Sequence, residues 1–217
     1  MYRKAILAVL ITVFLLTSGA FAKKPADVPS NAKETGWSGG GGSWCEATNW
    51  TDGLPALDKD AVIEGNLSGS GPVIGSGCAA EVAALDGPAK AKGDDVSLTV
   101  SGGSLTCSGE WIIAERGGTG LVTITSGSVD ALAGLFLPAD GGKDRLAHLS
   151  LEGGTLYVSS FALNLGGSLD ISGTGTLIVD GDQRNASWID SITYSVSPGD
   201  GQGAKNVTYD GSVTTIT

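Results

Sequence analysis

The stretch LTVSGGSL at residues 98–105 decides the fold, because two short runs of alternating apolar residues flank a corner of serine and glycine. The same pattern returns as LVTITSGSV at 121–129, LSLEGGTL at 149–156 and LDISGTGTL at 169–177. Alternation over short runs is typical of strands, and small residues suit sharp corners where φ is often positive. The chain from about Val96 is therefore predicted to be all-β.

The spacing of these segments indicates an internal repeat. The residues that close the four corners are 24, 27 and 21 positions apart; they are Leu105, Val129, Leu156 and Leu177. A second frame, made of glycines, has steps of 24, 24 and 25; its members are Gly93, Gly117, Gly141 and Gly166. A period of about 24 residues made only of strands and turns predicts a single-domain parallel β-helix, or β-solenoid. Leucine-rich repeats have similar periods, but their asparagine ladder is missing here.

Alternation also predicts which side chains face the interior. One coil rises only about 4.8 Å and cannot bury its own apolar face, so neighbouring coils must stack. The inward side chains are expected to be Leu98, Val100, Leu105, Val122, Ile124, Val129, Leu149, Leu151, Leu156, Val158, Leu169, Ile171, Leu177 and Val179.

The two ends of the repeat differ from its middle and are interpreted as caps. Three of the five tryptophans lie at the N-terminal end: Trp37, Trp44 and Trp50. At the other end, residues 183–192 are predicted to form a short helix that places Trp188, Ile189 and Ile192 over the last coil. Residues 206–209 and 213–216, joined around Asp210-Gly211, are predicted to form a closing hairpin.

The first residues predict export. Arg3 and Lys4 precede an apolar run from Ala5 to Leu16, and Ala20-Phe21-Ala22 fits a signal peptidase site. The predicted organisation is a signal peptide at 1–22, a flexible segment at 23–36, an N-terminal cap with irregular early coils at 37–95, regular coils at 96–180 and a C-terminal cap at 181–217.

Charge excludes some partners. The chain carries 13 Lys plus Arg against 23 Asp plus Glu, a net charge of −10. Removal of residues 1–22 takes away two positive charges and no negative ones, so the net charge becomes −12. Nucleic acids and anionic membrane surfaces require the opposite sign. No later apolar stretch approaches the length of a membrane span.

A family resemblance follows from the N-terminal motifs. Gly42-Ser43-Trp44, Asn49-Trp50 and Ala61-Val62-Ile63, with Pro55 and Asp58, resemble the opening of secreted bacterial β-solenoid surface proteins of the autotransporter-associated β-strand and PEP-CTERM-associated types. The glycine-rich repeats and the stretch from Gly181 to Thr217 are similar to that group as well. The resemblance implies the fold and a surface or extracellular location, and it implies no activity.

Residues able to support catalysis or metal binding are few. The one histidine, His148, is turned outward by alternation, and no serine or cysteine motif accompanies it in the sequence. No cofactor is expected, with calcium kept open as an alternative. Asp180-Gly181-Asp182 begins like an oxygen-ligand loop, but Arg184 stands where a further ligand belongs. Asp140-Gly141-Gly142-Lys143-Asp144 lacks the alternation of calcium-binding solenoid repeats.

Two residues are the candidates for a glycan site. Arg116 and Asp140 each precede a glycine of the 24-residue frame, which predicts that they lie roughly 5 Å apart on neighbouring coils. The plainer interpretation is an ion pair on an exposed corner. An aromatic row would favour carbohydrate binding, but Tyr157 aligns with Thr106 and Asp130, and Trp111 with Leu135 and Ser160.

The three cysteines leave one unpaired. Alternation buries Cys107, so Cys45 and Cys78 are favoured as a disulfide between the N-terminal cap and an early coil. An unpaired surface thiol open to a second chain is the alternative.

The sequence thus favours a secreted or cell-surface bacterial protein that is structural or adhesive and not an enzyme. Its expected partners are extracellular polysaccharide, other surface proteins or further copies of the same chain. A carbohydrate-binding module is the alternative, and a β-helical polysaccharide lyase or hydrolase ranks below both.

Overall fold

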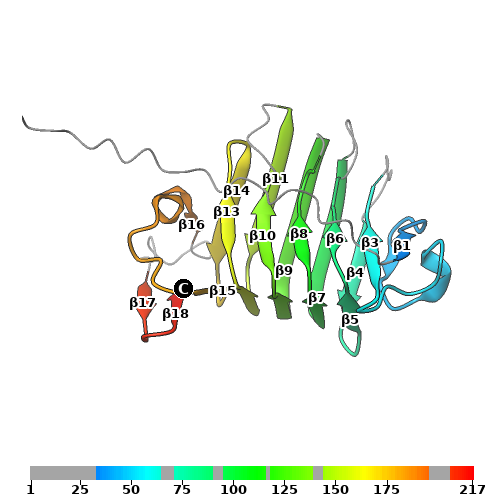
Figure 1. Ribbon diagram of the computed structural model, residues 1–217, viewed down its shortest axis with the longest axis horizontal. Helices are drawn as coiled ribbons and strands as arrows, with labels where there is room; N and C mark the ends of the chain where they lie inside the picture. Colours follow the sequence, from blue (N-terminus) through cyan, green and yellow to red (C-terminus); the bar gives the residue numbers. More distant parts are fainter. Residues whose placement is uncertain (1–32, 65–70, 90–94, 116–117, 139–143, 196–205) are drawn as a thin grey trace, which may run out of the picture.

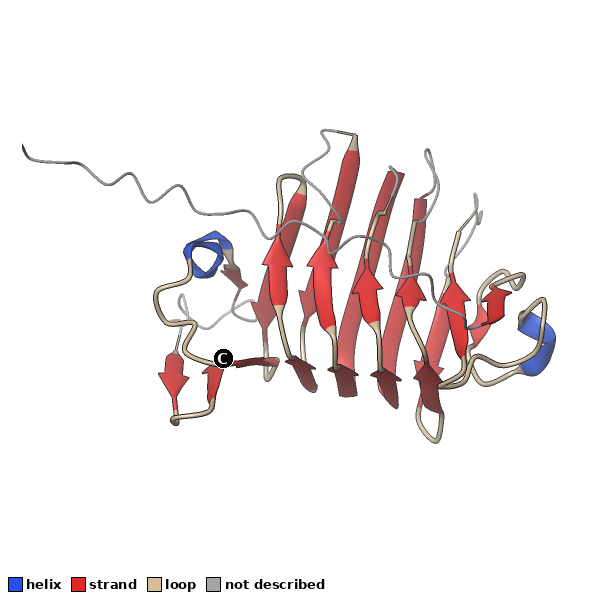
Figure 2. Ribbon diagram, in the orientation of Figure 1, coloured by secondary structure: helices blue, strands red, loops and turns tan. Residues whose placement is uncertain are grey.

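The computed structural model describes residues 33–64, 71–89, 95–115, 118–138, 144–195 and 206–217. The predicted signal peptide lies outside these residues. Strands dominate the described chain, and the two helices are single short 3-10 turns (Figure 2). No helix among the described residues is long and apolar enough to cross a membrane.

The strands stack as a parallel β-solenoid with three faces, which confirms the predicted fold (Figure 1). The first face contains β2 (Gly42–Ser43), β4 (Pro72–Gly75), the first halves of β7 (Asp95–Cys107) and β9 (Gly118–Ala131), β11 (Arg145–Leu151), β14 (Gly167–Ser172) and β16 (Thr193–Ser195). The second face contains β5 (Ala79–Val82), the second halves of β7 and β9, β12 (Thr155–Val158) and β15 (Thr176–Asp180).

The third face is a separate parallel sheet. It contains β1 (Lys33–Gly36), β3 (Lys59–Val62), β6 (Leu85–Asp86), β8 (Glu110–Ile112), β10 (Gly134–Leu137) and β13 (Phe161–Leu163). The first and second faces belong to one 12-stranded sheet, because β7 and β9 bend around the corner between them. The strands β2, β4, β7, β9, β11 and β14 each begin a coil, so the solenoid has about six turns.

The strand register confirms the repeat. The four corner-closing residues occupy one column across β7, β9, β12 and β15; they are Leu105, Val129, Leu156 and Leu177. All fourteen side chains predicted to face inward are at most 3% exposed. The core is therefore a set of apolar columns that run along the solenoid axis, as alternation predicts.

On the third face, the strand register differs at one position from the match between successive repeats that the sequence predicts. Trp111 aligns with Leu135 as expected, but Leu135 aligns with Phe161 rather than with Ser160. The step from β10 to β13 is therefore 26 residues, longer than the glycine frame. Trp111 itself is fully buried, and its indole N–H donates to the carbonyl of Gly87 at 2.8 Å.

The N-terminal end is closed by aromatic packing. Trp37 and Trp44 both pack edge-to-face on Trp50, with ring centroids 5.1 and 4.6 Å away. All three are buried, and Trp50 donates its indole N–H to the Trp44 carbonyl at 2.8 Å. Residues 33–36, assigned from the sequence to the flexible segment, instead form β1. The buried Thr35 hydroxyl donates to the Gly53 carbonyl at 3.0 Å and holds this strand to the cap.

The C-terminal end is closed by a helical turn and a hairpin. The helix is the 3-10 turn Ser187–Ser191, shorter than the predicted 183–192. It buries Ile189 and Ile192 and places Trp188 edge-to-face on Phe161, with centroids 4.8 Å apart. The predicted hairpin forms from β17 (Val207–Tyr209) and β18 (Val213–Ile216). Its β18 pairs antiparallel with β15 and so ends the parallel stack on the second face.

Candidate functional site

The outer surface of the second face has a column of small side chains. The column begins at Ala79 and continues through four hydroxyl residues in strict register: Ser104, Ser128, Thr155 and Thr176. Neighbouring members are separated by one strand spacing, about 4.8 Å. Short side chains leave this surface flat, and each hydroxyl can both donate and accept a hydrogen bond.

A shallow trough of about 390 Å³ runs beside this column, at the corner between the first and second faces. It is lined by Gly77, Cys78, Ala79, Gly102, Gly103, Ser104, Gly127 and Ser128. The trough exists because three corner glycines have positive φ: +79° at Gly77, +97° at Gly102 and +93° at Gly127. A Cβ at Gly127 would overlap the carbonyl of Gly103, so a larger residue there would force the corner apart.

Tyr157 is the aromatic side chain of the neighbouring outward column. It aligns with Asp130 and, one coil earlier, with Thr106, as the sequence alignment indicates. Its hydroxyl donates to Asp180 Oδ1 at 2.8 Å, and this hydrogen bond raises the pKa of the tyrosine above its ordinary value. The ring is thus held on the same surface as the hydroxyl column.

His148 lies on the outer side of the first face, as alternation predicts. Its Nδ1 is 2.7 Å from Ser168 Oγ, and its Nε2 is 3.5 Å from Asp170 Oδ2. Neither partner follows from the sequence repeat, because both come from the next coil, where the step is 20 residues rather than the 24 or 25 of the glycine frame. Only the strand register brings the three side chains together.

This cluster has the residue types of a serine hydrolase but a different setting. The side chains of His148 and Asp170 are 36% and 32% exposed on an open strand surface. An acyl-transfer site also needs N–H donors for the oxyanion. The strand that carries His148, β11, lies between β9 and β14, so its backbone N–H groups take part in the sheet. His148, Ser168 and Asp170 thus form a polar contact between neighbouring coils.

The predicted glycan-site pair cannot be placed. Arg116 and Asp140 lie outside the described residues, as do Gly117 and Gly141 of the same frame. The Asp140–Asp144 loop is described only at Asp144. The pairing of Arg116 with Asp140 stays a prediction.

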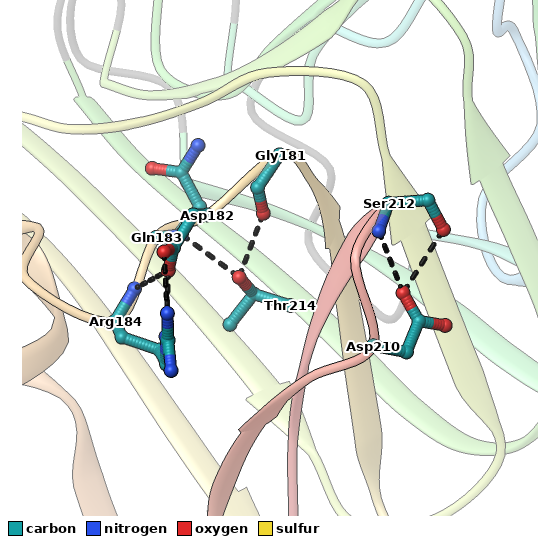
Figure 3. A network of polar contacts seen from close by, with 7 residues as sticks. All are labelled: Gly181, Asp182, Gln183, Arg184, Asp210, Ser212 and Thr214. Carbon is teal, nitrogen blue, oxygen red and sulfur yellow. Dashed lines mark hydrogen bonds and ion pairs between the residues drawn. The ribbon is translucent and has the colours of Figure 1, made fainter.

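Within the Asp180-Gly181-Asp182 segment, Gly181 and Asp182 make hydrogen bonds with other residues of the chain (Figure 3). Both oxygens of Asp182 accept hydrogen bonds from the Arg184 guanidinium, at 2.8 and 2.7 Å, and these bonds lower the pKa of Asp182 to about 2. The Thr214 hydroxyl donates to the Gly181 carbonyl and accepts from the Gln183 N–H. Within the described residues, no cluster of three or more His, Cys, Asp or Glu side chains is arranged to hold a metal ion.

The cysteines divide into a bonded pair and a buried thiol. Cys45 and Cys78 form a disulfide that joins the N-terminal cap to the turn before β5, across 33 residues of sequence. Cys107 is fully buried, and burial raises the pKa of its thiol to about 12. A thiol that stays protonated is a poor nucleophile and a poor metal ligand.

The chain matches no family model, no curated protein and no solved structure.

Proposed function

We propose that this protein is an exported, non-enzymatic adhesive rod of the bacterial surface or extracellular matrix, and that its second face binds extracellular polysaccharide. The observation that carries the proposal is the in-register column Ser104, Ser128, Thr155 and Thr176. A polymer of sugars presents hydroxyl groups at regular intervals, and a flat, regular row of hydroxyls can meet many of them at once.

The net charge, the disulfide and the N-terminal motifs support the same proposal. With a net charge of −12 after removal of residues 1–22, the protein repels acidic polymers, which favours a neutral polysaccharide. The Cys45–Cys78 disulfide suits an oxidising compartment outside the cytoplasm. The resemblance of the N-terminal motifs to secreted bacterial β-solenoid surface proteins agrees with an exported rod.

The test is retention on insoluble neutral polysaccharides such as cellulose, chitin and β-1,3-glucan. Ser128→Lys places a long charged side chain in the middle of the column and should abolish retention. Thr123→Lys, on the outer side of the first face of the same strand, is the matched control and should retain binding. Equal retention of both variants would contradict the role of the second face. Release of soluble sugar from the matrix would instead identify an enzyme.

A carbohydrate-binding module is the second candidate, and the position of Tyr157 favours it. An aromatic ring beside hydroxyl groups can stack on one sugar ring. This function predicts saturable binding of a short soluble oligosaccharide that is lost in Tyr157→Ala. An adhesive row instead binds long polymers strongly and short ones weakly, because its affinity comes from many weak contacts.

A further inference from the structure

The outer surface of the second face has a carboxylate and an aromatic ring side by side. Asp130 on β9 and Tyr157 on β12 are direct partners in the strand register, and both alternate with buried residues, so they point outward on neighbouring coils. One strand spacing, about 4.8 Å, separates their backbone positions. An ammonium group is attracted to a carboxylate and also to the face of an aromatic ring, so this pair has the chemistry to bind a cation.

The carboxylate of Asp130 is open to an external donor. The Tyr157 hydroxyl donates instead to Asp180 Oδ1 on β15, the strand on the other side of β12. Within the described part of the chain, no hydrogen bond or ion pair involves the Asp130 carboxylate. Its charge still reaches the ring, because the pKa of Tyr157 is raised mainly by the hydrogen bond to Asp180 and more weakly by the charge of Asp130. Asp130 thus has free oxygens beside a ring that Asp180 holds in place.

The second face is acidic as a whole. The outward side chains of its strands include the carboxylates of Glu81, Asp130 and Asp180, and no lysine or arginine is among these described outward residues. The net charge of the whole chain has the same sign. A polymer with positive charges is therefore attracted to this face both at long range and on contact.

We propose that the second face selects polysaccharides whose sugars carry free amino groups, with one ammonium group held between the Asp130 carboxylate and the Tyr157 ring. This inference rests on the proposed function, in which a polysaccharide lies on the hydroxyl column. Ser128 and Thr155 of that column come two residues before Asp130 and Tyr157 on the same strands, so one polymer can contact both columns. A neutral polymer binds through the hydroxyl column alone, and an amino polymer gains a charge-assisted contact as well. Asp130 is then the residue that determines specificity.

The test compares chitin particles with the same particles after partial removal of their acetyl groups in alkali. The two matrices share backbone, linkage and particle size, and they differ in their free amino groups. Co-sedimentation is measured at neutral pH and an ionic strength of about 0.15 M, where a Debye length of about 8 Å screens charges on the other faces. We expect the parent chain to bind the deacetylated particles roughly ten-fold more tightly than chitin, because the amino group adds a charge-assisted hydrogen bond.

Two matched variants assign the preference to a residue. Asp130→Asn keeps the shape of the side chain and removes its charge, so it should bind both matrices equally. Asp170→Asn makes the same change in net charge on the outer side of the first face and should keep the preference. Loss of the preference in both variants would assign it to net charge and overturn the inference.

The parent chain separates this inference from the proposed function. Equal binding of the parent chain to the two matrices would overturn the amino-sugar preference and leave the hydroxyl column as a binding surface. Binding to cellulose or β-1,3-glucan but to neither chitin matrix would also overturn the inference alone. Binding to none of these polymers would contradict the proposed function and the inference with it.

Discussion

Trp111 on β8 donates its indole N–H to the carbonyl oxygen of Gly87, one coil earlier, at 2.8 Å. The bond is buried inside the solenoid, and Trp111 has no exposed surface. A single side chain thus both fills the core and fixes the spacing of two successive coils on the third face.

Trp111→Phe keeps an aromatic ring but leaves the Gly87 carbonyl without its donor. We expect the free energy of unfolding to fall by about 2–3 kcal/mol, which combines an unsatisfied buried acceptor with a small cavity. The measurement is urea denaturation at equilibrium. Trp188→Phe is the control, since Trp188 is only partly buried against Phe161, and it should cost under about 1 kcal/mol. Equal losses of unfolding free energy in the two variants would show that the hydrogen bond from Trp111 to Gly87 does not contribute the stability assigned to it.

Gly127→Ala tests the corner glycines. Its φ of +93° disfavours any side chain, and a Cβ would overlap the Gly103 carbonyl of the previous coil. We expect a loss of about 2 kcal/mol or more in the free energy of unfolding. Gly75→Ala is the matched control, because a Cβ there meets nothing within 4 Å. It should be neutral or stabilise by up to about 1 kcal/mol. A neutral Gly127→Ala would contradict the account of the corner.

The disulfide is expected to stabilise the N-terminal cap. Replacing both Cys45 and Cys78 by serine should lower the free energy of unfolding by about 3–4 kcal/mol, from the loop-closure entropy of a 33-residue separation. A reductant should lower the stability of the parent chain by a similar amount and leave the double variant unchanged. Sensitivity of the double variant to reductant would assign the effect to Cys107 instead.

Acid titration tests the C-terminal cap. Asp182 has an ordinary pKa of 3.8, and its hydrogen bonds to Arg184 lower the pKa to about 2 in the folded chain. A lowered folded-state pKa means that the contribution of this pair is present above about pH 4 and is lost as the pH falls towards 2. Arg184→Gln should return the pKa of Asp182 towards 3.8 in a carboxyl NMR titration and weaken the fall of stability in that window.

Asp210 supplies an internal control for that titration. Its pKa is lowered by hydrogen bonds from the backbone N–H groups of Val213 and Ser212 in the hairpin turn. Figure 3 shows the contact with Ser212. These bonds do not involve Arg184, so the pKa of Asp210 should stay low in Arg184→Gln. A shift of both carboxyl groups would mean that the hairpin itself had opened.

The core could be predicted from the sequence because it depends on local alternation. A residue such as Leu105 or Val129 faces inward whatever the length of the next coil, so the inward set follows without knowing the register. The caps could be predicted because tryptophans and a hairpin signal interrupt the repeat. Both features depend only on short stretches of neighbouring residues.

Contacts between coils could not be predicted in the same way, because they depend on coil lengths. A step of 20 residues brings Ser168 beside His148, and a step of 26 puts Phe161 beside Leu135. A uniform frame of 24 or 25 residues misses both.

The central claim is that the hydroxyl column of the second face binds polysaccharide, and the most direct test is co-sedimentation with insoluble cellulose, chitin and β-1,3-glucan. The parent chain and Thr123→Lys should sediment with at least one of these polymers, and Ser128→Lys should stay in the supernatant. Light scattering on the same samples should report single rods. No sedimentation with any of the polymers, or equal sedimentation of all three proteins, would contradict the account. Oligomers that dissociate in Ser128→Lys would instead make the second face a contact between copies of the chain.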